Sequence, residues 1–227
     1  MKKLLLLASI LAAFTVSSAM AAAKFSIVGT ADLAMPSYKD MVDSSIAPGT
    51  LSGTTSGKAQ FGGGLLVEFP LSNRVGLELG ALYMTRKYDA TMTFTPADGS
   101  AAQSLDVTFK HPYIQVPLMF NLHLNKFLTL GLGGYLNNGI GQISETRSNV
   151  EEKNSYDEAE FKRLDYGVAA GLGIGIPMGS KVAFIIDARY NMGLAEQYSP
   201  KADSTLAMKQ KNNDVTGFVG FRFGANK

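Results

Sequence analysis

Apolar residues alternate with small or polar ones along segments of this chain that are each about as long as a membrane-crossing strand. Between residues 75 and 86, Val75 and Leu77 fall on one face of an extended strand, and Gly76 and Glu78 on the other. A period of two residues indicates β-strands with two different faces. The pattern recurs in residues 61–69, 164–176 and 182–192.

The second face of these segments is mostly glycine and alanine, with an isolated charge here and there. A soluble β-sandwich would alternate too, but its second face would be polar and in contact with water. Small residues with sparse charges of both signs instead suit a narrow lumen filled by side chains, with the apolar face outward in lipid. The pattern favours a membrane barrel, and a soluble periplasmic β-protein is the alternative.

The alternation predicts an all-β fold, an up-and-down antiparallel transmembrane barrel of eight strands. Long connections at 36–57, 90–105, 139–160 and 195–213 alternate with tight turns, as in outer-membrane barrels with short periplasmic turns and long external loops. Each strand exceeds the ~9–11 tilted residues that cross a bilayer. The strands are expected at residues 23–35, 58–70, 74–89, 106–122, 126–138, 161–177, 181–194 and 214–224.

Residues 1–21 have the features of a secretory signal peptide. Lys2 and Lys3 precede an apolar run, and Ala19 and Ala21 form an A-x-A cleavage pattern. The run is shorter than the ~20 residues of a spanning helix, and no second long apolar stretch follows. We therefore expect residues 22–227 to form one barrel domain, exported to the bacterial outer membrane.

Composition excludes several functional classes. The chain has no cysteine, which rules out disulfides, thiolate nucleophiles and cysteine-bound metals. Removing the signal peptide takes two of the 21 basic residues and leaves 19, equal to the 19 acidic ones. This balance, without a basic run, argues against nucleic acid as a partner. The glycine-rich segments 131–134 and 171–175 lie within predicted strands, so no nucleotide site and no cofactor are expected.

Several charged residues fall on the small-residue face of the predicted strands. In a narrow lumen they should pair, because an isolated buried charge is too costly. They could be a static plug of ion pairs, which we favour, or a gate on an ion path. The glycines of the predicted strand at residues 161–177 could leave a cavity, which the side chains of Met84, Met119, Phe218 and Arg222 could fill. The predicted lumen charge network is Glu68, Glu78, Arg86, Asp165, Asp187, Arg189 and Arg222.

Outward aromatic residues fall near both ends of the predicted strands, as in the aromatic girdles of membrane barrels. They are Phe69, Tyr83, Phe120, Tyr166, Phe184, Tyr190 and Phe223. The three hairpins share a basic turn residue followed nine positions later by Tyr83, Tyr135 or Tyr190. That repeat would point Tyr135 outward, whereas the leucines of the same strand require it to point inward. We follow the leucines and expect a one-residue difference in the turn.

Other features have weaker interpretations. His111, with Ser104 and Asp106 nearby in sequence, could belong to a rim-site lipid A-modifying enzyme. His123 is expected to be a solvated turn residue, and Pro117 to cause a β-bulge.

Loop 36–57 is expected to be mobile. The acidic loop 139–160 lacks calcium-loop spacing, so it is expected to be a solvated face rather than a cation site, and no metal is predicted.

Three segments resemble the PorT-type outer-membrane β-barrel family: residues 111–122 (HPYIQVPLMFNL), 164–174 (LDYGVAAGLGI) and 185–194 (IIDARYNMGL). The resemblance implies the same barrel fold. It also implies that the protein could be an accessory barrel of a protein-secretion system, since the family includes such a component.

The sequence therefore predicts a non-enzymatic outer-membrane barrel that either presents loops and stabilises the envelope or acts as a small-solute porin. The expected partners are outer-membrane lipid and lipopolysaccharide, the Sec export and barrel-assembly machinery, and a possible surface or secretion partner bound by the external loops.

Overall fold

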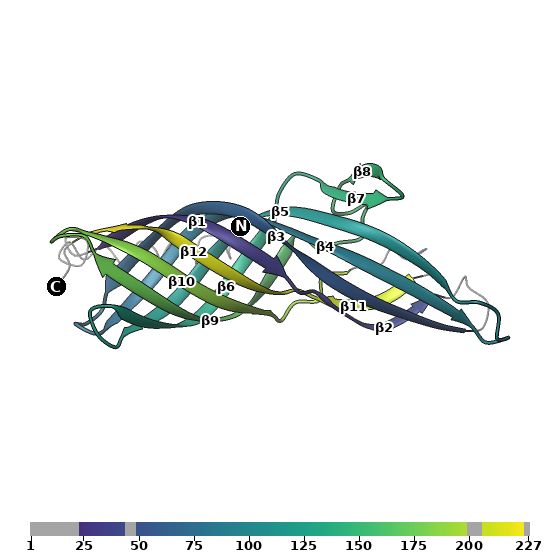
Figure 1. Cartoon of the computed structure of the whole chain (residues 1–227), viewed down its shortest axis with the longest axis horizontal. Coiled ribbons are helices and arrows are strands. Elements are labelled where there is room, and N and C mark those ends of the chain that lie inside the picture. Colours follow the sequence, from purple (N-terminus) through teal and green to yellow (C-terminus); the bar gives the residue numbers. More distant parts are fainter. Residues whose placement is uncertain (1–22, 44–48, 199–205, 225–227) are drawn as a thin grey trace, which may run out of the picture.

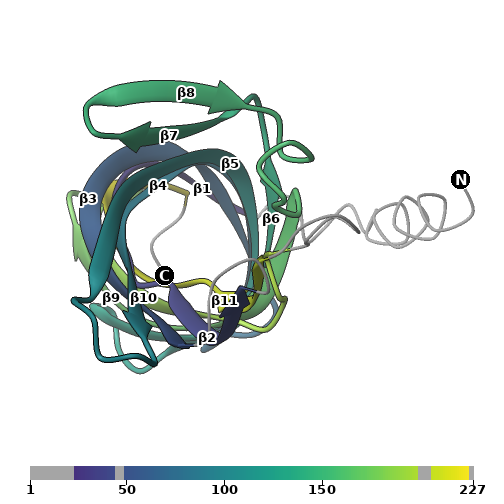
Figure 2. The same cartoon turned by 90° about the vertical axis from the view of Figure 1, so that its right-hand side faces the viewer.

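A computed structural model describes residues 23–43, 49–198 and 206–224. The predicted signal peptide, residues 1–21, lies outside this range. Eight antiparallel strands form a closed ring in which consecutive ring strands are hydrogen-bonded and β1 pairs with β12. Figures 1 and 2 show the ring from the side and along its axis. Within the described residues, no helix has the length and hydropathy that a transmembrane helix requires.

The predicted strands are all present, with shifted ends. The ring consists of β1 (Lys24–Ala34), β3 (Gly49–Pro70), β4 (Val75–Pro96), β5 (Gln103–His123), β6 (Leu128–Gly139), β9 (Leu164–Pro177), β10 (Val182–Gly193) and β12 (Asn213–Phe223). Four short strands lie in the long connections: β2 (Ser37–Asp43) pairs with β11 (Leu206–Lys211), and β7 (Ile143–Arg147) pairs with β8 (Val150–Asn154).

Three ring strands extend well beyond the others on the side away from the tight turns. β3 and β4 have 22 residues each and β5 has 21, whereas β1 and β12 have 11. The expectation that 36–57 and 90–105 are loops was therefore wrong over much of their length. Threonines favour strands, and Thr50 lies opposite Thr95 and Thr54 opposite Thr91. The external parts of β3 and β4 lie outside the membrane and need no apolar face. The alternation of apolar and polar residues therefore does not reveal them in the sequence.

The expected bulge at Pro117 is also absent. Leu79 pairs with Leu118 and Leu82 with Gln115 in one unchanged register, so the β4–β5 ladder skips the proline without inserting a residue. The bulge lies instead between β3 and β4, where five steps from Lys58 to Gly63 match four on β4. An extra residue there increases the local bend and twist of β3.

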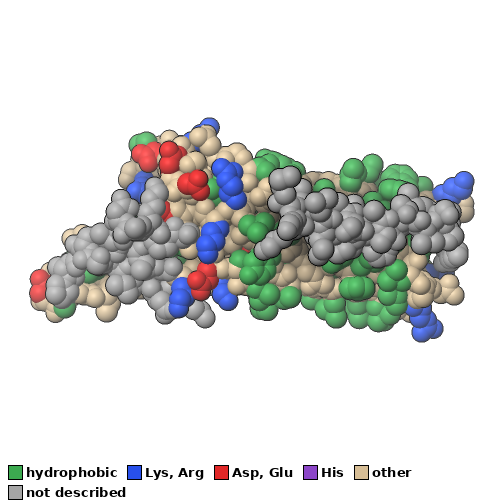
Figure 3. Space-filling model, turned by 180° about the vertical axis from the view of Figure 1, so that it is seen from behind, with side chains coloured by type: hydrophobic (Ala, Val, Ile, Leu, Met, Phe, Trp, Pro, Cys, Tyr) green, Lys and Arg blue, Asp and Glu red, His purple; other side chains and the backbone are tan. Residues whose placement is uncertain are grey.

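Apolar side chains cover the outside of the barrel, and charged and polar side chains fill the inside together with apolar ones such as Leu82 and Met84. Leu132 is 67% exposed whereas Tyr135 is 5% exposed, so the leucines of β6 face outward and Tyr135 faces the lumen, as expected. Lys126 occupies the third position of its four-residue turn, and Arg74 and Lys181 the fourth, which is the expected one-residue difference. Figure 3 shows a belt of hydrophobic side chains over the half that ends in the tight turns.

The predicted interfacial aromatics all lie on the outer face. Tyr83, Phe120, Tyr166, Tyr190 and Phe223 are exposed. Phe69 and Phe184 are half-buried, and Phe184 packs edge-on against Phe221 at 5.6 Å.

A charge placed in the apolar belt should destabilise the barrel. Leu132→Arg is expected to lower the free energy of unfolding in lipid vesicles by about 2–4 kcal/mol, the cost of an arginine near the bilayer midplane. The matched control is Val150→Arg, because Val150 is 61% exposed on the β7–β8 hairpin outside the belt. Denaturant titration should show the control unchanged; equal losses for both variants would contradict the assignment of the belt to lipid.

Candidate functional site

The lumen at the tight-turn end is organised around Glu68. This carboxylate is buried and contacts two cations and a histidine ring: Lys24 Nζ at 2.9 Å, an Arg222 nitrogen at 3.8 Å and His123 Nε2 at 3.0 Å. His123 Nδ1 also lies 2.9 Å from Thr129 Oγ1. The expectation that His123 is only a solvated turn residue was therefore wrong, because β5 continues to this position and turns its side chain toward the lumen.

A second carboxylate lies directly beside the first. Glu78 is the cross-strand partner of Glu68, and like charges so placed repel each other. The amide of Asn121 donates to both, at 3.1 and 3.3 Å. Arg189 Nη1 lies 2.8 Å from Glu78, and Arg189 Nε donates to Asp187 at 2.9 Å. This network gives each glutamate its own cation.

The aromatic ring of Phe218 completes the Arg189 site. The guanidinium carbon lies 4.5 Å from the ring centroid, in the range of a cation–π contact. Met119 and Tyr135 are buried nearby with Ala169, so the small residues of β9 face large ones from β5 and β6. The glycines of β9, the predicted strand 161–177, also have bulky neighbours: Gly167 lies against Tyr135 and Gly171 against Arg189.

Arg86 is the centre of a second level of ion pairs in the lumen, on the external side of the network around Glu68 and Glu78. Its Nη2 lies 3.0 Å from Asp214, its Nη1 lies 3.5 Å from Asp165, and its guanidinium sits 5.0 Å from the Tyr113 ring centroid. Thr216 donates to Asp32 at 2.9 Å, and Asn191 donates to Asp214. Asp214 is fully buried.

Sequence reasoning missed two members of this level. Asp32 and Asp214 fall at the outer ends of β1 and β12, where the predicted alternation was weakest. The sequence did contain a signal for Asp32. Residues two positions apart in a strand share a face, and Asp32 lies on the inward face of β1 with Val28 and Thr30. The structure brings all seven predicted lumen charges to the inside of the ring, and adds the charges of Lys24, Asp32 and Asp214 and the ring of His123.

A layer of aromatic rings lies on the external side of Arg86. His111 is buried, with its ring centroid 5.8 Å from Tyr88 and 4.9 Å from Phe161. Tyr156 packs edge-on to His111 at 6.4 Å and donates to the carbonyl of Pro112 at 3.0 Å. Burial raises the pKa of the Tyr156 phenol to about 12, which keeps it protonated as the donor.

Ser104, Asp106 and His111 do not come together as a Ser/His/acid set. Ser104 and Asp106 lie on the opposite face of β5, since residues 107, 109 and 111 turn inward. Ser104 bonds to Thr93 and Asp106 accepts from Thr91. The residues of the proposed rim-site enzyme are therefore not brought together.

A small cavity lies in the membrane part of the lumen. It has a volume of about 20 Å³ and is bordered by Glu78, Asn121, Asp187, Arg189, Phe218 and Arg222. That volume holds about one water molecule.

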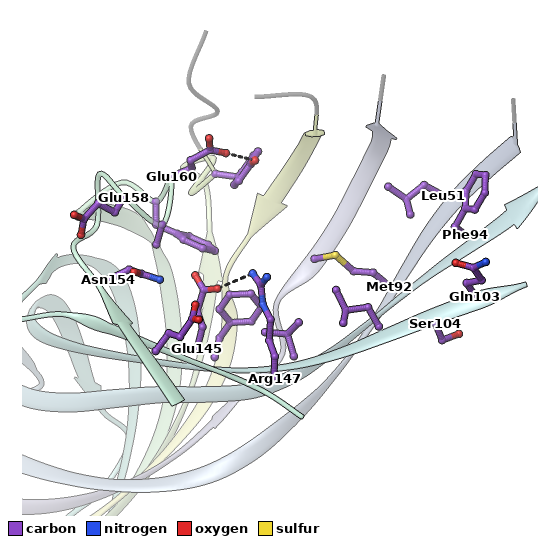
Figure 4. A pocket seen from close by; sticks show the side chains of 17 residues that line it. Leu51, Met92, Phe94, Gln103, Ser104, Glu145, Arg147, Asn154, Glu158 and Glu160 are labelled. Carbon is purple, nitrogen blue, oxygen red and sulfur yellow. Dashed lines mark hydrogen bonds and ion pairs between the residues drawn. The ribbon is translucent and has the colours of Figure 1, made fainter. Parts of the chain in front are cut away.

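A much larger pocket opens on the external side. It has a volume of about 700 Å³ and is lined by residues of β3, β4, β5, β7 and β8, together with residues 158–161 and Tyr198 (Figure 4). Apolar side chains from the strands, including Leu51, Met92 and Phe94, form one wall. Glu145, Arg147, Glu158 and Glu160 form the other.

The acidic loop contributes side chains to this pocket, while Glu151, Glu152, Asp157 and Glu158 are exposed, as expected for a solvated face. Glu145 is buried and pairs with Arg147 at 2.9 Å, and Glu160 accepts a hydrogen bond from Tyr198. Glu158 caps the turn at Ser155, with its carboxylate 2.7 Å from the Ser155 amide. In the part of the chain that the structure describes, no three His, Cys, Asp or Glu side chains converge as a metal site.

Comparison with known proteins agrees with this architecture. A family model described as outer membrane protein beta-barrel domain matches residues 13–198. OprG from Pseudomonas aeruginosa aligns with a TM-score of 0.54 at 16% identity, over 91% of this chain and 97% of that protein. Neisserial surface protein A aligns with a TM-score of 0.45 at 13% identity, over 88% and 96%.

At 16% identity the similarity to OprG shows the fold alone. No curated sequence gives a significant match. The family match covers most of the chain and agrees with the closed eight-strand ring and its apolar outer belt. This chain belongs to the outer membrane protein β-barrel domain family and is an outer-membrane protein of the bacterial envelope.

Proposed function

We propose that this protein is a non-enzymatic barrel with a sealed lumen, and that it acts through its external part. The observation that carries the proposal is the lumen itself. Two levels of ion pairs and one aromatic layer occupy the ring, and the cavity beside Arg189 has a volume of only about 20 Å³. An eight-stranded barrel is only wide enough for its own side chains to fill.

Opening a solute path would require breaking several buried contacts at once. Arg86 and Arg189 each bind two carboxylates, and Val28, Leu66, Leu82, Met84 and Phe218 pack as an apolar cluster beside them. Removing one partner of a buried pair leaves an uncompensated charge and costs about 3–5 kcal/mol. A small-solute porin is therefore the less favoured function.

An enzymatic role is not supported by the rim geometry. His111 is buried among aromatic rings, and Ser104 and Asp106 point to the other face of β5. A lipid A-modifying activity would require another set of catalytic groups. The site that supports a function is instead the external pocket of about 700 Å³, which can receive a surface or secretion partner.

Export and assembly complete the proposal. The signal-peptide pattern at residues 1–21 supports Sec-dependent export with cleavage after Ala21, and the closed barrel supports insertion by the barrel-assembly machinery. The three segments that resemble the PorT-type family support membership of that group. A secretion-accessory role would be revealed if deletion of the gene blocked export of other proteins.

Solute uptake into liposomes tests the sealed lumen. Vesicles containing the refolded mature protein should take up small solutes no faster than protein-free vesicles, with an open porin as positive control. Folding is verified by the heat-modifiable shift on a gel. Uptake well above background that changes in Arg189→Met or Arg222→Met would contradict the proposal and indicate a porin with a charged constriction.

If the buried ion pairs form a structural plug, breaking one of them should destabilise the folded barrel. Arg189→Met leaves Glu78 and Asp187 without their cation and is expected to lower the free energy of unfolding by about 3–5 kcal/mol. The control Arg74→Met removes an exposed arginine from a tight turn and should change stability by less than about 0.5 kcal/mol. Denaturant titration in detergent micelles measures both, and equal small effects would argue against a structural plug.

A further inference from the structure

Three lysines lie in one row across neighbouring strands. Lys58 of β3 is the cross-strand partner of Lys87 of β4, and Lys87 is the partner of Lys110 of β5. Directly opposed residues in a sheet have Cβ atoms about 4.5–5.5 Å apart and share a face. The row therefore presents three positive charges side by side.

This lysine row faces outward. On β4, Arg86 and Tyr88 are buried inside the ring, so Lys87 between them points to the outer surface. Lys58 and Lys110 are exposed, and Lys87 is half-buried.

The row carries more positive charge than its neighbours neutralise. Lys58 pairs with Asp89 at 2.8 Å, and Asp89 also accepts from Thr108 at 2.6 Å. Within the described residues, Lys87 and Lys110 form no ion pair. Like charges directly opposite each other destabilise a sheet. An anion bound at the row would relieve this repulsion.

The position of the row relative to the membrane identifies the kind of anion. Tyr83 marks the outer edge of the apolar belt on β4, and Lys87 lies four residues farther out. Four residues of a strand span about 13 Å, or about 10 Å along the barrel axis at the usual tilt. Interfacial tyrosines sit at headgroup level, so the flexible lysine side chains reach the headgroup layer of the outer leaflet.

Exposed apolar side chains lie next to the lysine row, on the side toward the membrane centre. Phe61, 80% exposed on β3, and Tyr83, 50% exposed on β4, lie on the same outer face toward the membrane centre. A lipid with its headgroup at the lysines would have its acyl chains along these side chains. The lysine row is therefore continuous with the lipid-facing surface.

We propose that Lys58, Lys87 and Lys110 form a binding site for the phosphate of a phosphorylated glycolipid of the outer leaflet, such as lipid A. A phosphate carries several acceptor oxygens and close to two negative charges, so neighbouring lysines can share it. Asp89 holds Lys58 in place at the external side, leaving Lys87 and Lys110 to make the main contacts.

Another basic pair at the external edge of the belt provides a matched control. Lys162 and Arg163 precede Leu164 at the start of β9, but they border a hollow of about 760 Å³ that also includes Asp157, Glu160 and Glu196. Arg163 stacks on the Tyr156 ring at 4.9 Å. Nearby carboxylates balance the charge there, so Lys162→Gln should not affect lipid binding.

The test measures binding of bis-phosphorylated lipid A to the folded protein in nanodiscs or mixed micelles, by native mass spectrometry. The Lys58→Gln, Lys87→Gln, Lys110→Gln triple variant should lose at least about tenfold in apparent affinity, because hydrogen bonds to charged groups contribute strongly. Lys87→Gln alone should show an intermediate loss, and Lys162→Gln no loss. The heat-modifiable gel shift establishes that each variant is folded.

Two further probes separate a lipid site from a general anion site. Dephosphorylated lipid A should bind the unmodified protein as weakly as the triple variant binds the phosphorylated form. Millimolar inorganic phosphate should compete poorly, since it lacks acyl chains. Equal binding by the triple variant, equal binding of dephosphorylated lipid A, or full competition by inorganic phosphate would each overturn the proposal.

Discussion

Backbone hydrogen bonding in lipid is the constraint on which the rest of this structure depends. The bilayer core offers no water to an unpaired amide or carbonyl, so strands can cross it only as a closed ring. Pairing of β1 with β12 closes the ring and removes both edges. Pro117 fits because the β4–β5 ladder skips it without a change in register, so no residue is forced out of line.

Closure with eight strands determines what the interior must contain. A ring of this size has room for side chains and almost nothing else. The glycines of β9 face large groups such as Tyr135 and Arg189, and charged groups fill most of the remaining space as mutually compensating pairs. In soluble proteins apolar side chains lie inside, whereas here they face lipid. The charged and polar groups therefore lie inside the ring. Function is consequently displaced to the external strands and their surfaces.

The membrane-crossing part was predictable because lipid imposes a strict alternation on it. The eight strands, the inward Tyr135 and the lipid-facing leucines all follow from that alternation. The external extensions of β3 and β4 were not predictable in this way, because strands in water can be polar on both faces. Asp32, Asp214 and His123 were missed because they lie at strand ends, where two or three residues of pattern are too few to assign a face.

Which side chains pair inside the lumen depends on how neighbouring strands are aligned. The residue pattern of a single strand does not contain this alignment. Arg86 of β4 meets Asp214 of β12 across the ring, a contact between residues 128 positions apart. Only the complete set of cross-strand registers places these two side chains at the same height. The lysine row is the corresponding case on the outer surface: three unremarkable lysines become a site only when the strands are aligned.

A double-mutant cycle on Arg86 and Asp214 tests the central claim most directly. Arg86→Met and Asp214→Asn, singly and together, would be compared with the unmodified protein by denaturant unfolding in lipid vesicles. The sealed-plug account predicts a coupling energy of about 1–3 kcal/mol, as for buried groups in one network. Additive losses, with no coupling, would show that the two side chains do not form a structural pair in the folded barrel and would contradict the account.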